Sequence, residues 1–308
     1  MKADEFDSII FDCDGVLIDV TKSYDTTINK TISYVLKEIA DITVDTPLTN
    51  ELLLSFKSTG GFNDEIDITY AGILCFIAAK KLNKNPTELI SDVINNADDS
   101  GITYIENFLK KINVDVSDVK ARLNYPSTDK NDLIHSTFDQ LFFGPELYGR
   151  VFQKESKFSE KGFIENDNVI VNSKLIEALK KRFNDKIAIV TGRGFNAISS
   201  SLKEILNQFN VENSVFLEDE SRDLAKPNPQ SLIRSIKGLN SKNCLYVGDS
   251  MEDMILVQKA SELGFQTTFC GIYGSGKLPE MKKKMFIEKN IPFILESINF
   301  LPKALNLV

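Results

Sequence analysis

The sequence lacks several features that mark whole classes of protein. It has no window of about 18 uncharged apolar residues, and its first ten residues carry acids where a secretory signal carries a basic region and then an apolar stretch. Its four cysteines show no CxxC spacing, and His135 is the single histidine. We therefore expect a cytoplasmic protein whose thiols are reduced and buried, and in which His135 lies at the surface or packs.

Positive charge is also scarce. The chain has 36 Lys and Arg against 44 Asp and Glu, so its formal net charge is -8. This balance disfavours nucleic acid and anionic membranes as partners, and a phosphate-bearing ligand would need a local cation or backbone donors. The 308 residues, 42% of them apolar, suit a globular protein of two domains. We expect a monomer or a homodimer.

Short apolar runs alternate with helical patterns before about residue 20 and after about residue 165. Such alternation is typical of βαβ units and predicts an α/β fold with an open parallel sheet. The expected strands are 8–11, 187–190, 214–217, 244–247, 267–270 and 292–295. The clearest expected helices are 171–183, with Asn172 or Ser173 as its N-cap, and 227–239.

Residues 21–164 differ, because long helical patterns such as 23–40 and 86–97 run through them without a clear alternating strand. They predict an inserted all-α domain, with residues 1–20 and 165–308 forming the α/β core. Ligands of such cores bind at the carboxyl ends of the parallel strands. The first strand should therefore end at the mouth between the two domains.

The first strand runs into two carboxylates, Asp12 and Asp14, within the segment IIFDCDGVLID. Side chains two residues apart on a strand point to the same face, so these acids would repel one another unless a cation lies between them. The strand at 244–247 leads to two further acids, Asp249 and Asp253. Acids at two strand ends suggest a metal or a reaction.

The other strand ends supply groups for an anion. Thr191 and Gly192 follow the strand at 187–190, and a hydroxyl beside a glycine at a strand-to-helix turn offers an OH and free backbone N–H groups. A single lysine, Lys226, lies in the proline-stiffened segment AKPNP.

Taken together, DxDGV at 12–16, VTGR at 190–193, KPNP at 226–229 and GDSMED at 248–253 resemble the four motifs of the haloacid dehalogenase (HAD) superfamily of phosphohydrolases. The helical insert between the first two motifs resembles the C1 cap of subfamily I, which includes phosphoglycolate phosphatase and β-phosphoglucomutase. The insert is larger than the typical cap of that group, so the substrate cannot be carried over.

The resemblance implies a Rossmannoid α/β core with a parallel sheet and an inserted all-α cap. It also implies a Mg²⁺-dependent phosphohydrolase that acts on a small phosphorylated metabolite through an aspartyl-phosphate. Asp12 would be the nucleophile and a metal ligand, with Asp249 and the Asp14 carbonyl completing the metal site. Asp14 would protonate the leaving oxygen and later activate water. Asp253 would support the metal through water or bond to Lys226.

The resemblance also implies which groups hold the phosphoryl oxygens. They are the Thr191 hydroxyl, the Lys226 amine and backbone N–H groups around Gly192 and Cys13, and Arg193 is a further candidate for binding the phosphate or the substrate. Cys13 is expected to pack rather than react, because the CxxxxxR loop of cysteine phosphatases is absent.

A glycine pair in the insert is the candidate substrate loop. Lys57, Gly60, Gly61 and Asn63 could read a carboxylate, a sugar or a second phosphate, since glycines let the backbone approach a ligand. A helix-breaking loop is the alternative. The run GGFND also resembles a small group of uncharacterised archaeal and bacterial HAD phosphatases.

Other functions are weighed against this one. A phosphomutase or a non-enzymatic small-ligand-binding protein stays open, whereas a dehalogenase is disfavoured because that branch lacks the acid at Asp14. A phosphonate hydrolase would need a Schiff-base lysine, for which Lys57 is the candidate. The run GIYGSGK at 271–277 imitates a nucleotide-binding P-loop, but Leu278 stands where the metal-binding Ser or Thr belongs.

Overall fold

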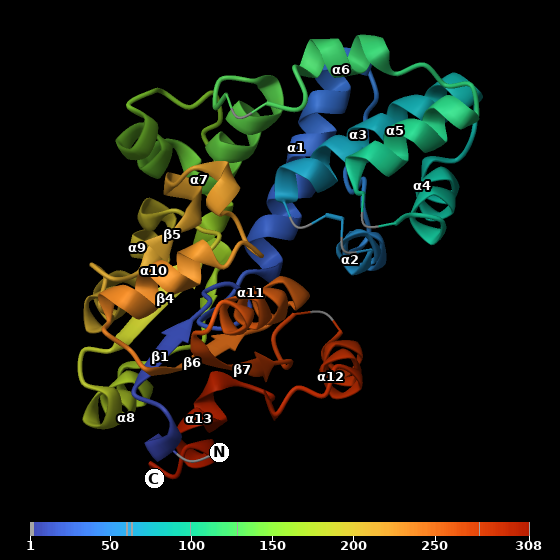
Figure 1. Cartoon of the computed structure of the whole chain (residues 1–308). Coiled ribbons are helices and arrows are strands. Elements are labelled where there is room, and N and C mark those ends of the chain that lie inside the picture. Colours follow the sequence, from blue (N-terminus) through green and yellow to red (C-terminus); the bar gives the residue numbers. More distant parts are fainter. Residues whose placement is uncertain are drawn as a thin grey trace. The chain divides into compact units, whose positions relative to one another are not determined.

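The computed structural model describes residues 3–59, 61–62, 64–98, 100–127, 129–276 and 278–307, which separate into two units (Figure 1). One unit comprises Met1–Thr21 with Asp167–Val308, and the other comprises Lys22–Asn166. Each unit is described by itself.

The first unit is built on a six-stranded parallel sheet of order β5-β4-β1-β6-β7-β8. Its strands are β1 (Ser8–Phe11), β4 (Ile187–Thr191), β5 (Val215–Phe216), β6 (Asn243–Gly248), β7 (Gln266–Ile272) and β8 (Phe293–Leu295). The predicted α/β class with a parallel sheet is confirmed. Leu217, expected to end a strand, instead begins a 3-10 turn, so β5 is shorter than its apolar run.

Helices cover both faces of this sheet. They are α8 (Ser173–Phe183), α9 (Phe195–Leu202), α10 (Gln230–Gly238), α11 (Met251–Glu262), α12 (Pro279–Glu288) and α13 (Leu301–Ala304). Side chains of β1 point alternately to the two faces of the sheet, so the core has two halves. Ile9 and Phe11 pack with α8, α9 and α13 on one face. Ile10 packs with α10, α11 and α12 on the other face. Asn172 caps α8 by accepting a hydrogen bond from Leu175 N, as the sequence predicts.

A two-stranded antiparallel ladder marks the points where the chain leaves and re-enters this unit. β2 (Ile18–Asp19) pairs with β3 (Asn168–Val169), with Ile18 opposite Val169 and Asp19 opposite Asn168. The sequence gives no signal for strands of two residues. The ladder places the two crossings side by side.

The second unit contains helices joined by loops, and no strand occurs among its described residues. Its helices are α1 (Thr21–Ala40), α2 (Asn50–Ser58), α3 (Glu65–Leu82), α4 (Pro86–Asn95), α5 (Ile102–Lys111), α6 (Ser117–Leu123) and α7 (Leu133–Phe152). The central helix is α3, whose residues from Ile68 to Ala79 are all buried. A helix that is apolar on every side needs neighbours all round it, which explains the number of shorter helices.

Short 3-10 segments complete the chain at Ala3–Glu5, Phe163–Asn166, Lys203–Gln208, Leu217–Asp219, Arg222–Leu224 and Ile298–Phe300. Within the described ranges, no helix combines the length and apolar content that crossing a bilayer requires.

Candidate active site

The carboxyl ends of three neighbouring strands carry the first acids and the hydroxyl. Asp12 directly follows β1, Thr191 is the last residue of β4, and Asp249 directly follows β6. Because β1 lies between β4 and β6 and all three are parallel, these residues share one edge of the sheet. The Asp12 N–H donates to Val247 O at 2.8 Å, so the strand pairing fixes the backbone of Asp12 itself.

Lys226 joins two of the acids. Its Nζ lies 2.8 Å from Asp12 Oδ1 and 2.8 Å from Asp253 Oδ1, and all three side chains are buried. Burial raises the pKa of Asp12, as do the nearby acids, while Lys226 opposes the rise. Burial alone would lower the pKa of Lys226, but Asp12 and Asp253 raise it well above its usual value. The lysine therefore stays charged beside the candidate nucleophile.

Asp253 is held from every side. One of its oxygens accepts hydrogen bonds from Lys226 and the Tyr246 hydroxyl, and the other accepts from the Asp249 N–H and from the N–H and hydroxyl of Ser250. The Ser250 contacts form a capping box at the start of α11. Although burial acts to raise it, the pKa of Asp253 is lowered by Lys226 and by these donors. Asp253 thus anchors Lys226 through a direct hydrogen bond.

Arg193 binds the second acid of the first motif. Its Nε lies 2.8 Å from Asp14 Oδ1, and its Nη atoms contact both oxygens of Asp167 at 2.7 and 3.3 Å. The Ser201 hydroxyl also donates to Asp167, at 2.7 Å. The guanidinium is almost completely buried, so it holds Asp14 in one orientation and links it to the segment where the chain re-enters this unit.

A tight turn after Asp14 brings Asp249 close. Gly15 has a φ of +73°, and a Cβ there would lie 2.1 Å from Asp249 Oδ2, so only glycine fits. The same carboxylate accepts a hydrogen bond from Lys282 Nζ at 2.5 Å. On the other side of the turn, the Ser275 hydroxyl donates to Gly15 O.

These acids suit a hard divalent cation. In the described part of the chain, Asp12, Asp249 and Asp253 each offer an oxygen within 4.8 Å of the others. The surrounding ion pairs contain five carboxylates and three cations, namely Asp12, Asp14, Asp167, Asp249 and Asp253 against Lys226, Arg193 and Lys282. Carboxylates therefore outnumber cations here, which favours the binding of a further cation. Since Asp253 is already engaged at both oxygens, Asp12 and Asp249 are the better direct ligands.

The remaining predicted residues fall in three places. Gly192 is exposed, and a Cβ there would meet no atom within 4 Å, so the space above this turn is open. Cys13 is fully buried, and its carbonyl accepts the N–H groups of the turn that follows. Lys57 and Gly61 belong to the helical unit, where Lys57 Nζ lies 3.3 Å from Glu65 Oε1. Gly60, Asn63 and Lys277 lie outside the described residues.

Three residues of this site escaped prediction. In the sequence, Tyr246 is indistinguishable from the apolar residues around it in the predicted strand. In the structure, its hydroxyl lies 3.0 Å from both Val190 O and Asp253 Oδ1. Lys282 reads as part of the solvated run KKK, and Asp167 as a polar loop residue. An aromatic hydroxyl two residues before a GD motif is the one weak signal, because a buried Tyr normally bonds its hydroxyl.

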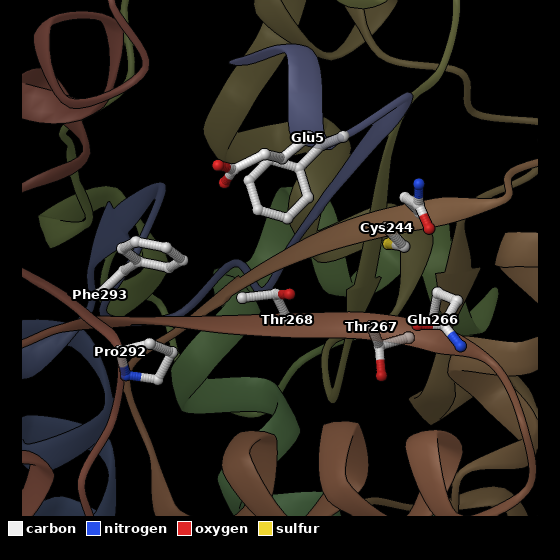
Figure 2. Close-up of a pocket in the computed structure, with 9 residues that line it drawn as sticks. Glu5, Cys244, Gln266, Thr267, Thr268, Pro292 and Phe293 are labelled. Carbon is white, nitrogen blue, oxygen red and sulfur yellow. The ribbon is translucent and has the colours of Figure 1, made fainter. Parts of the chain in front are cut away.

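A pocket of about 420 Å³ lies elsewhere, at the beginnings of β6, β7 and β8 (Figure 2). Figure 2 shows Cys244, Thr267, Thr268 and Phe293 around it, with Glu5 from the N-terminal segment. None of the motif residues lines it. This pocket is at the opposite ends of the strands from Asp12, so it is not the reaction site.

Comparisons with known proteins agree with this geometry. A family model described as haloacid dehalogenase-like hydrolase matches residues 6–260. Phosphatase Tt82 from Thermococcus thioreducens is similar in structure, with a TM-score of 0.59 and 21% identity over 91% of this chain and 98% of that one. A predicted phosphoglycolate phosphatase from Haemophilus somnus 129pt follows, with a TM-score of 0.52 and 15% identity over 97% and 98%.

No curated protein gives a significant match. At such low identities the two structures establish a shared fold, whereas the family model identifies the sequence itself. The resemblance of the four motifs is thereby confirmed. The chain belongs to the haloacid dehalogenase-like hydrolases.

Proposed function

We propose that this protein is a Mg²⁺-dependent phosphatase that hydrolyses a small phosphomonoester through an aspartyl-phosphate at Asp12. The main support is the buried contact of Lys226 with Asp12 at a strand end shared with Thr191 and Asp249. A carboxylate beside a fixed cation and a group of acids suits phosphoryl transfer, which depends on positioning and charge neutralisation. Family membership agrees with this choice, and both similar structures described above are named as phosphatases.

In the first step an Asp12 oxygen attacks phosphorus and the bond from phosphorus to the ester oxygen breaks. The departing oxygen takes a proton from Asp14, which Arg193 orients at 2.8 Å. In the second step Asp14 removes a proton from water, which attacks phosphorus and releases Asp12. Lys226, the Thr191 hydroxyl and the Gly192 N–H bind the phosphoryl oxygens. A Mg²⁺ ion held by Asp12, Asp249 and the Asp14 carbonyl would neutralise the negative charge of the phosphoryl group.

The helical unit would serve as a cap that excludes water from the aspartyl-phosphate. Its two connections, near residues 20 and 165, would act as hinges. The β2–β3 ladder supports this proposal, because two adjacent crossings can bend together about one axis. A liganded structure with this unit far from Asp12 in every state would refute it.

The proposal is tested by measuring inorganic phosphate released from a panel of phosphomonoesters, with Mg²⁺ and with a chelator. Asp12→Asn should lower kcat about a thousandfold or more, because it removes the nucleophilic charge and a metal ligand. Asp185→Asn makes the same change on an exposed loop and should be silent. Full activity of Asp12→Asn, or equal activity in the chelator, would rule the mechanism out.

Lys57 is proposed to recognise a second anionic group of the natural substrate. Lys57→Ala should then lower kcat/KM by about 1.5–3 kcal/mol for panel members that carry such a group, and hardly at all for a simple aryl phosphate. Equal losses on both substrates would mean that Lys57 supports the fold, through contacts such as the one with Glu65. No loss on either would leave the glycine pair as a helix-breaking loop.

A further inference from the structure

Lys282 is the one residue of the run Lys282–Lys284 that turns toward the acids. Its Nζ lies 2.5 Å from Asp249 Oδ2 and 3.3 Å from Ser275 O. By contrast, Lys284 pairs with Glu288 on the surface, where both side chains are mostly exposed. The side chains of Lys282 and Asp249 are only 22% and 18% exposed, so their ion pair is partly shielded from water.

This ion pair involves the carboxylate that we assign to the metal. A protonated amine and a divalent cation cannot both lie against one carboxylate without repelling each other, and the effect is strong where water is partly excluded. We propose that Lys282 is an internal counter-ion that competes with Mg²⁺ for Asp249 and so sets the metal affinity of the enzyme. This inference rests on the metal site of the proposed function.

The surroundings show which of the two side chains can move. Asp249 Oδ2 lies directly against Gly15, 2.1 Å from the position of a Cβ there, so the carboxylate is enclosed on that side. Lys282 reaches Asp249 from α12, and 22% of its side chain is exposed to water. A long, flexible lysine can swing outward at little cost. Metal binding should therefore displace Lys282 and leave Asp249 in place.

Competition of this kind has a measurable size. The apparent affinity for metal falls by the fraction of molecules in which Asp249 is free of the lysine. A partly buried, charge-assisted hydrogen bond between Lys282 and Asp249 would reduce the fraction of molecules with a free Asp249 roughly tenfold. Breaking the ion pair should therefore strengthen metal binding, whereas a lysine that orients Asp249 for the metal would weaken it when removed.

The test is calorimetric titration of Mg²⁺ into metal-free protein, with Lys282→Met and the matched control Lys284→Met. Methionine replaces the unbranched apolar stem of lysine and removes both the charge and the donor. We expect Lys282→Met to bind Mg²⁺ about tenfold more tightly than the wild type and Lys284→Met to bind it equally. Unchanged or weaker binding by Lys282→Met would overturn the inference, as would equal tightening in both variants.

Two further measurements distinguish failure of the proposed metal site from failure of the competition between Lys282 and Mg²⁺. Asp249→Asn should weaken binding, and if no variant or wild type binds Mg²⁺, the proposed metal site itself fails. Thermal melting covers loss of stability in Lys282→Met: without metal its Tm should fall, because the acids lose a counter-ion, and Mg²⁺ should raise its Tm more than that of the wild type. An equal rise in both proteins would contradict the competition.

Discussion

At the scale of single residues, Tyr246 shows how a strand interior supports the candidate site. Its hydroxyl oxygen lies 3.0 Å from Val190 O, just before Thr191, and 3.0 Å from Asp253 Oδ1. The ring faces Lys226, whose Nζ is 5.7 Å from the ring centroid. Burial and the nearby Asp253 raise the pKa of Tyr246, so the phenol keeps its proton. The Tyr246 hydroxyl thus connects the end of β4 to Asp253, the residue that binds Lys226.

Replacing Tyr246 with Phe should lower the free energy of unfolding by about 1–2 kcal/mol, because the fully buried Asp253 carboxylate loses a hydrogen-bond donor. The control is Tyr273→Phe, on a half-buried tyrosine just after β7, which should stay within about 0.5 kcal/mol of the wild type. Urea denaturation at neutral pH measures both. Equal stability of Tyr246→Phe and the wild type would show that the hydroxyl contributes nothing net.

At the scale of elements, hydrogen bonds of Asp7 connect the beginning of β1 to the turn before β6. It accepts hydrogen bonds from the Ser241 hydroxyl at 2.7 Å and from the N–H groups of Lys242 and Asn243 at 3.0 Å, and Lys186 lies 3.4 Å away. Partial burial acts to raise the pKa of Asp7, but these donors and the lysine together lower it from 3.8 to about 2. The charged form is therefore favoured by folding.

A lowered pKa stabilises the folded state above the pKa of the unfolded chain, and this contribution disappears as the pH falls from about 4 through about 2. Asp7→Asn should cost on the order of 1 kcal/mol at pH 7, after allowance for solvent screening. The difference from the wild type should shrink towards pH 2. Denaturant melts across this range measure it, with Asp185→Asn as the control. A difference that does not depend on pH would contradict the assignment.

The elements that could be predicted from sequence are those whose own residues carry the signal. The apolar run at Ser8–Phe11 and the cap at Asn172 are local, and both lie where the sequence predicts them. The β2–β3 ladder pairs two segments that the whole helical insertion separates in the sequence, so no local sequence pattern marks it. Leu217 is apolar enough for a strand, but the chain turns there, and the next two side chains, Glu218 and Asp219, accept hydrogen bonds from the Gly194 and Phe195 N–H groups.

The same distinction applies to the candidate site. Asp12, Thr191 and Asp249 follow predicted strands, so parallel topology alone brings them together. Lys282 depends on how α12 packs and which face it turns inward, and three successive lysines cannot reveal that. For Arg193, sequence could locate the residue, but its burial against Asp14 and Asp167 required the full structure.

At the scale of the whole molecule, the cysteines are divided between the units. Cys75 lies in α3 of the helical unit, whereas Cys13, Cys244 and Cys270 lie in the α/β unit. Burial raises the pKa of Cys75, Cys244 and Cys270 to about 12 and raises that of Cys13 well above its usual value. Thiolates are therefore scarce at pH 8, and the thiols are covered as well.

All four thiols should resist a thiol reagent in the native protein at pH 8. As urea is added, Cys75 should become reactive over a different concentration range from the other three, because each unit has its own core and multi-domain chains often unfold in parts. Peptide mapping after pulsed alkylation identifies which cysteine reacts. A single range for all four would show that the units unfold together.

The β2–β3 ladder has a consequence for how this chain can change over time. Because Asp19 and Asn168 are paired neighbours, the two ends of the helical insertion lie about one strand spacing apart. An inserted segment whose ends are adjacent can be lengthened, shortened or replaced by another without distorting the sheet into which it is inserted. The sheet and the helical insertion can therefore change in sequence and length independently of one another.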